Sequence, residues 1–195
     1  RFFTHILSRV VWRSGIHLQT KTTMDTLDYS NETLSQGSKA VIAAAGPPVR
    51  KLTYKVPASL KLPSEFTNPG MNIPGILVLQ AEYKGRSQSE DENSRLAAAA
   101  AKSGNFDGLP LMVLADDSGF TCKTVENFLW VTFTRTDPPS DIYGVNEFIE
   151  DKHWGCRGPL IIDARIKPHH PLPVGADPEA DKFGARREQK GGSLY

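Results

Sequence analysis

Gly75-Ile76-Leu77-Val78-Leu79-Gln80-Ala81 is the stretch that decides the fold. It is apolar almost throughout and has the length of a strand that is covered on both faces, so we expect a central strand. Two further runs have the same character. Leu109 to Ala115 carries Pro110 at its start, where a missing amide costs least, and Leu160 to Asp163 is the last predicted strand.

A fourth buried strand is predicted upstream, from Ser38 to Ala45, where small apolar residues are stopped by Gly46-Pro47-Pro48. Residues 15–30 before it are rich in Thr and lack a helical period, so they predict extended chain or loop. Residues 49–74 after it carry four prolines among polar residues and predict an irregular connection.

Two helices are expected between the strands. Ser89 and Glu92 have the spacing of a capping box, which predicts a helix from about Glu90 to Ser103. Thr124 to Thr134 combines residues that suit a helix with residues that suit a strand, and we assign a helix capped by Thr124.

This order of elements predicts an α/β fold: a layered sheet with crossover helices and an extended carboxy-terminal tail. Residues 1–14 have helical apolar spacing and are expected to form an amphipathic helix that continues a missing amino-terminal part. Residues 15–166 form the α/β domain. Residues 167–195 carry too little apolar surface for a core and are expected to dock on a neighbouring domain or subunit.

Composition narrows the functional classes. The 195 residues have a net charge of +1 with both signs interspersed, which argues against a nucleic-acid partner. No apolar stretch approaches the roughly 20 residues that span a bilayer. The two cysteines, Cys122 and Cys156, are far apart in the sequence, which favours neither a disulfide framework nor a zinc site and fits a reducing, cytoplasmic setting.

Several polar residues have both a structural and a chemical interpretation. Asp116 and Asp117 end a predicted strand, where turn and capping roles are favoured over shared-proton chemistry. Asp163 and Arg165 share a strand face and are expected to pair. Arg135 suits either a bound carboxylate or an ion pair with an acid that follows it, and we favour the ion pair, with Asp137 or Asp141.

The remaining candidates are aromatic residues, histidines and a thiol. Tyr143, Phe148 and Trp154 suit a flat pocket or, more often, packing beneath a loop. A metal site built from histidines and Cys156 is disfavoured because the spacing matches no common site. Cys156 as a nucleophile has little support. The histidines concerned are His153, His169 and His170.

Several ordered segments together resemble the UbiD family. Leu111 to Asp117 is an apolar strand closed by paired acids, and it is followed by the helix at Thr124 and by Thr134-Arg135. His153 to Cys156 and Gly158 to Arg165 look like a later strand of the family. The likeness extends from about Met24 to His170 and also includes Gly37-Ser38-Lys39.

The resemblance implies a decarboxylase or carboxylase that uses prenylated FMN, with manganese and potassium, on an aromatic or α,β-unsaturated acid. In such enzymes an amino-terminal domain holds the cofactor, the metal ligands and the catalytic residues. The chain is similar to the carboxy-terminal part, which oligomerises and closes one wall of the site, so no catalytic residue or metal ligand is assigned here. Only Lys102 matches a family lysine that contacts the cofactor phosphate, and a solvated lysine at a helix end is an equally good interpretation.

Two hypotheses therefore stand. In the first, the chain is part of a carboxy-lyase, inactive alone, whose partners are an amino-terminal UbiD-type domain or chain and further copies in a homo-oligomer. In the second, it is a non-catalytic assembly subunit of a carboxylase built from several subunits. The irregular connection at residues 49–74 and the polar tail suit a chain that wraps around a neighbour.

Overall fold

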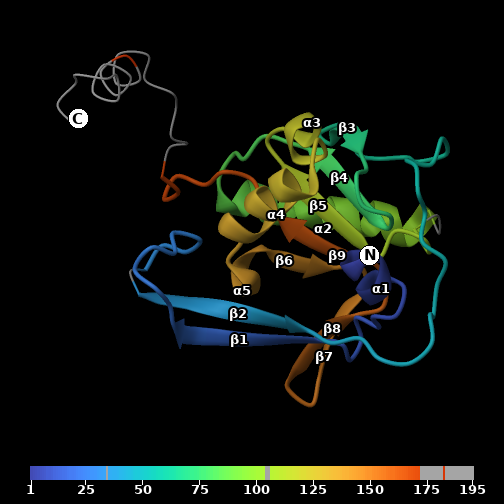
Figure 1. Cartoon of the computed structure of the whole chain (residues 1–195), viewed down its shortest axis with the longest axis horizontal. Coiled ribbons are helices and arrows are strands. Elements are labelled where there is room, and N and C mark those ends of the chain that lie inside the picture. The colour runs from blue at the N-terminus through green and yellow to red at the C-terminus, as the bar shows by residue number, and fades with distance from the viewer. Residues whose placement is uncertain (34, 104–105, 172–181, 183–195) are drawn as a thin grey trace, which may run out of the picture.

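The computed structural model describes residues 1–33, 35–103, 106–171 and 182. A five-stranded sheet with the order β3-β4-β5-β9-β6 forms its centre, and two separate hairpins, β1-β2 and β7-β8, extend from it (Figure 1). The α/β class predicted from the sequence is confirmed. The strands are β1 (Ile16–Thr23), β2 (Gln36–Ile42), β3 (Thr67–Gly70), β4 (Ile76–Gln80), β5 (Leu111–Ala115), β6 (Ile142–Gly144), β7 (Glu147–Glu150), β8 (His153–Cys156) and β9 (Leu160–Asp163).

Three parallel strands make the interior of this sheet. β4 pairs with β5 from Ile76 opposite Leu111, and β5 pairs with β9 from Leu111 opposite Leu160. All of β5 and β9 is buried, as parallel strands covered on both faces should be. The edge strands β3 and β6 are antiparallel to their neighbours. The three apolar runs in the sequence therefore identified the interior strands correctly, with β5 rather than β4 at the centre.

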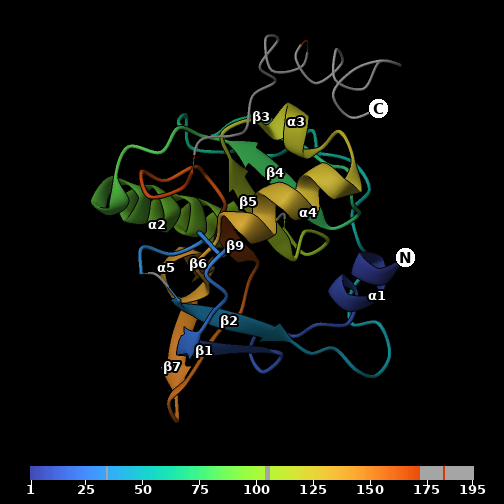
Figure 2. The same ribbon diagram turned by 60° about the vertical axis from the view of Figure 1, so that its left-hand side comes forward.

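Helices cover the two faces of the sheet, as Figure 2 shows. On one face the side chains of Leu77 and Met112 pack with Leu96 of α2, and on the other Val78 and Val113 belong to the same cluster as Phe128 of α4. Alternation along each strand separates these two cores. The helices are α1 (Phe2–Leu7), α2 (Arg86–Ser103), α3 (Ser118–Thr121), α4 (Val125–Thr134) and α5 (Pro138–Asp141).

The start of α2 differs from its prediction. The helix begins at Arg86, and the Ser89 amide donates to the Gly85 carbonyl over 3.0 Å, which is an intrahelical bond. Ser89 therefore lies within the helix and does not cap it, so the capping-box assignment is wrong. The physical reason is Gly85, whose φ of +105° lets the chain turn into the helix one turn earlier. The predicted end at Ser103 is correct.

The β1-β2 hairpin is a second correction. Residues 15–30 were expected as loop or extended chain, yet Ile16–Thr23 forms a strand that pairs with Gln36–Ile42. Most of β2 is exposed, including Ala40 and Val41, so the predicted buried strand from Ser38 to Ala45 is wrong about burial. The apolar run belongs to a hairpin outside the central sheet, where a strand-like pattern implies no burial.

The other local predictions are largely correct. Thr124 caps α4, because its hydroxyl accepts from the Asn127 amide over 3.1 Å, and Asp117 caps α3 in the same way. Residues 49–74 are mainly irregular and include only β3. Among the described residues, no helix combines the length and apolar character needed to cross a membrane.

The chain ends need separate mention. The opening helix α1 stops at Leu7, earlier than predicted, and Trp12 beyond it donates to the Pro110 carbonyl over 2.7 Å. Residues 1–14 therefore pack on the core of the domain. Most of the tail predicted at 167–195 lies outside the described residues, and its docking on a neighbour stays a prediction.

Candidate functional site

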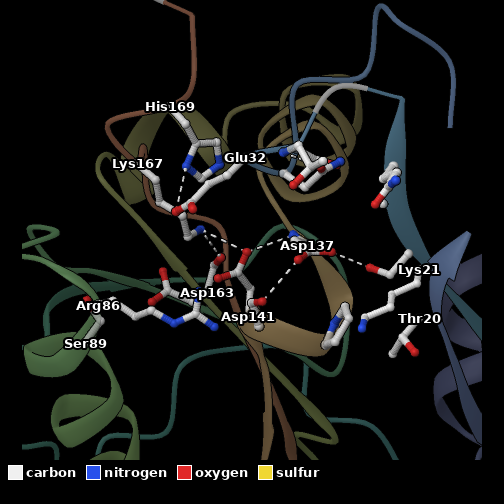
Figure 3. Close-up of a pocket in the computed structure, with 18 of the residues that line it drawn as sticks. Thr20, Lys21, Glu32, Arg86, Ser89, Asp137, Asp141, Asp163, Lys167 and His169 are labelled. Atoms are coloured by element: carbon white, nitrogen blue, oxygen red, sulfur yellow. Dashed lines mark hydrogen bonds and ion pairs between the residues drawn. The ribbon is translucent and has the colours of Figure 1, made fainter. Parts of the chain in front are cut away.

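A polar cleft of ≈ 540 Å³ lies between the β1-β2 hairpin and the carboxyl ends of the parallel strands (Figure 3). Ligands of open α/β sheets are commonly bound at these strand ends. One wall comes from the hairpin and its loop, and the other from the start of α2, from α5 and from the segment after β9. Its lining includes Thr20, Lys21, Glu32, Ser38, Tyr83, Arg86, Ser89, Asp137, Asp141, Tyr143, Asp163, Lys167 and His169.

Arg165 anchors the floor of this cleft and is completely buried. Its Nη2 atom lies 2.6 Å from Asp163 Oδ2, and its Nε donates to Asp163 Oδ1 over 2.9 Å. Nη1 reaches Glu92 Oε2 at 2.7 Å and the Glu82 carbonyl at 2.9 Å. One guanidinium thus satisfies two buried carboxylates, and the predicted pairing of Asp163 with Arg165 is confirmed.

Lys167 makes the second buried cation of the floor. Its ammonium lies 3.2 Å from Asp141 Oδ2 and donates to the Asp163 and Arg135 carbonyls, each at 3.0 Å. Asp141 also accepts from the Asp137 amide over 2.7 Å. The floor is therefore a closed network in which each buried charge has an opposite charge beside it.

Burial and charge act differently on the two acids. Burial raises the pKa of Asp141 to about 6, although the Lys167 ammonium beside it acts in the opposite direction. Burial also opposes ionisation of Asp163, but its hydrogen bonds and ion pair with Arg165 prevail and lower its pKa. Asp141 is thus the floor carboxylate that exchanges a proton nearest neutral pH.

The upper walls carry looser contacts. Ser38 donates to Asp137 across the cleft, and Asp137 accepts also from the Ser140 hydroxyl at 3.1 Å. Glu32 lies 3.8 Å from Nδ1 of His169. These pairs connect the hairpin to the sheet domain and fix the width of the cleft.

Two buried polar atoms beside the floor have no partner within the described part of the chain. They are the Ser89 hydroxyl and the Asn93 side-chain carbonyl. Ser89 lines the cleft and Asn93 lies one turn further along α2. An unmet buried polar atom costs free energy, so such atoms in a cleft indicate where a ligand group gains most.

The structure separates the residues that the sequence singled out. Lys102 is exposed in the last turn of α2 and is not part of the cleft. Arg135 pairs with Asp116 at 3.3 Å, so the expectation of Asp137 or Asp141 as its partner is wrong. Strand end and helix end meet there because β5 and α4 pack together.

The aromatic and sulfur candidates do not meet in one site. Tyr143 lines the cleft, whereas Phe148 and Trp154 belong to the outlying β7-β8 hairpin. Burial raises the pKa of the Cys156 thiol to about 12, which opposes a thiolate nucleophile. His169 and His170 lie with ring centroids 4.4 Å apart, and Cys156 belongs to a different hollow.

Sequence reasoning missed Glu92, Asp141 and Lys167 as members of a site. Glu92 looked like a capping residue, and Lys167 like the first residue of a polar tail. A signal existed for neither, because their shared feature is burial beside an opposite charge, which depends on the meeting of α2, α5 and β9.

The cleft does not fit the cofactor that the resemblance implies. A flavin phosphate is a dianion, and four carboxylates line this cleft, those of Glu32, Asp137, Asp141 and Asp163. Lys102 supplies one cation at a distance from the cleft. Within the described ranges, no group of three or more acidic, histidine or cysteine side chains has an arrangement that holds a metal ion. The described residues thus form neither a complete flavin site nor a metal site.

The geometry defines an α/β domain with a ligand-sized polar cleft and without an assembled catalytic group. Comparison with known proteins adds the family. Residues 1–44 match the C-terminal domain of 3-octaprenyl-4-hydroxybenzoate carboxy-lyase, the UbiD_C family. The chain belongs to the UbiD family, as a carboxy-terminal part of its enzymes.

Relatives extend the match along the whole chain. An uncharacterized protein of Chlamydia caviae is 31% identical over 172 residues, covering 88% of this chain and 28% of that protein. A protein of Chlamydia pneumoniae that is named as a 4-hydroxybenzoate decarboxylase subunit is 27% identical over 182 residues, 93% of this chain and 29% of that protein. The chain therefore spans less than a third of the length of these relatives.

Among solved structures, an evolved dimeric form of the UbiD-class enzyme HmfF from Pelotomaculum thermopropionicum, in complex with prFMN, matches 55% of this chain and 21% of that one. The identity is 24% and the TM-score 0.35. So loose a superposition supports no statement about the site.

Proposed function

We propose that this chain is the carboxy-terminal part of a prenylated-FMN-dependent decarboxylase or carboxylase that acts on an aromatic or α,β-unsaturated carboxylic acid. The observation that carries the proposal is the alignment of 93% of the chain with a protein that is named as a 4-hydroxybenzoate decarboxylase subunit. The match of residues 1–44 to the carboxy-lyase C-terminal domain supports the same activity.

In this proposal the chain closes one wall of the active site and contributes to a homo-oligomer in the cytoplasm. The flavin, manganese and potassium are held by an amino-terminal domain or a separate chain. The poor fit of the cleft to a flavin phosphate supports this division. The flavin supplies the electron sink for the carbon–carbon bond chemistry when bound, while protein side chains orient the acid and exclude water.

Lys102 remains the proposed contact of this chain with the cofactor phosphate. Its side chain is exposed, and within the described residues its ammonium takes part in no ion pair or hydrogen bond. It is therefore available to a phosphate presented by another domain. The competing role is a solvated lysine beside the negative end of the α2 dipole.

The test is purification of the native assembly that contains this chain. We expect a yellow complex with prenylated FMN that releases carbon dioxide from an aromatic or α,β-unsaturated acid. A colourless assembly without flavin would instead support the second hypothesis, a non-catalytic assembly subunit of a carboxylase built from several subunits. Light scattering on the same sample measures whether more than one copy of the chain is present.

A further inference from the structure

The start of α2 has an unmet demand for an acceptor at the edge of the cleft. The first amides of any α-helix have no acceptor within the helix. The residue before this helix is Gly85, which has no side chain to cap it, and the space where a Cβ would stand is open. The first turn of α2 also contains no acidic residue. Solvent or a ligand must therefore satisfy these donors.

A buried hydroxyl at the same place points to a ligand independently. Ser89 is 3% exposed, lines the cleft and has a side-chain oxygen without a partner in the described part of the chain. It lies one turn after Arg86, so the two residues share a face of the helix, and both line the cleft (Figure 3). A guanidinium and a free hydroxyl thus flank the donor end of an 18-residue helix.

The charges around this point favour an anion of low charge. The partial positive charge of the helix start and the Arg86 guanidinium both attract an anion. Arg86 is held only by Glu90, at 3.3 Å, and this pair is so exposed that it gives way at little cost. Lys21 adds a cation on the opposite wall.

The acids of the cleft limit which anion can enter. Asp163 and Asp141 are neutralised by the buried cations of the floor, and Asp137 accepts hydroxyl hydrogen bonds on the far wall. Glu32 lies near His169 and is mainly exposed. These four carboxylates still repel a dianion about twice as strongly as a monoanion, by Coulomb's law.

We infer that the start of α2, with Arg86 and Ser89, is a binding site for the singly charged carboxylate of a small organic acid. Arg86 donates to the carboxylate as a fork, the Ser89 hydroxyl donates a further hydrogen bond, and the first amides of α2 complete the set. Nothing in this inference depends on the proposed decarboxylase activity, since it concerns binding by the chain alone.

The test is titration of the full 195-residue chain with acetate at constant ionic strength, followed by amide NMR signals. We expect saturable shifts at residues 86–89 with a dissociation constant on the order of 1 mM. Acetamide, which has the same shape without the charge, should produce none. Inorganic phosphate tests the other source of anion, and phosphate binding as tight as that of acetate overturns the assignment to a carboxylate.

Variants locate the site. Arg86→Gln should weaken acetate binding about tenfold or more, and Ser89→Ala about three- to tenfold. Arg95→Gln and Ser94→Ala are matched controls on the same helix, where neither residue lines the cleft, and both should bind as the wild type does. Equal affinity in the cleft variants and the controls overturns the inference. Melting curves of all four variants establish that each remains folded.

Discussion

Replacement of Arg165 by methionine tests the buried charge network directly. The change leaves Glu92 and Asp163 without the cation that lies 2.7 Å and 2.6 Å from them. Removing one partner from a buried ion pair costs about 3–5 kcal/mol, because the remaining charge stays out of water. A domain of this size is stable by roughly 5–15 kcal/mol, so Arg165→Met should lose a large share of its stability.

Urea unfolding of the full chain, followed by tryptophan fluorescence, measures this loss. Arg157→Met is the matched control, since Arg157 pairs with Glu150 at 3.0 Å and both side chains are about half exposed. That exposed pair should contribute no more than about 1 kcal/mol. A loss for Arg165→Met as small as that for Arg157→Met would refute the account of the floor.

A combined variant and a pH series separate lost charge from lost packing. Arg165→Met together with Glu92→Gln and Asp163→Asn removes all three charges, and we expect it to be more stable than Arg165→Met alone. In Arg165→Met the carboxyl pKa values should rise, because burial then acts without a compensating cation. Folded Arg165→Met consequently binds more protons than its unfolded state, so it should gain stability relative to the wild type as the pH falls from 7 to 5.

Three further predictions use the same unfolding assay or flavin content. Burial raises the pKa of Asp141 from 3.8 to about 6, so its contribution to stability should fall by about 3 kcal/mol as the pH rises through this interval. Asp141→Asn should lack this component, and an unchanged pH profile between pH 4 and 7 would contradict it. Thr124→Ala should cost about 1 kcal/mol because it removes a true cap, whereas Ser89→Ala should be neutral or slightly stabilising; equal losses would contradict the observed start of α2. In the complete enzyme, Lys102→Ala should reduce flavin retention after gel filtration about ten- to hundredfold without lowering the melting temperature, and wild-type retention would leave Lys102 an ordinary surface lysine.

The sequence by itself determined the interior of the sheet and one helix cap. The runs that became β4, β5 and β9 are apolar on both faces, and burial on both faces is a local property that the pattern of residues records. The Thr124 cap was predictable for a similar reason, because a cap joins residues three positions apart. The family resemblance also needed only ordered short motifs.

Tertiary structure alone decided the cleft and its floor. Arg165 binds Glu92, which is 73 residues away in the sequence, and Lys167 binds Asp141 from another element. The same acids and bases in a different arrangement would be ordinary surface charges, and their sequence spacing contains no trace of the pairing. Burial selected these partners, because an ion removed from water must meet an opposite charge wherever the packed elements place one.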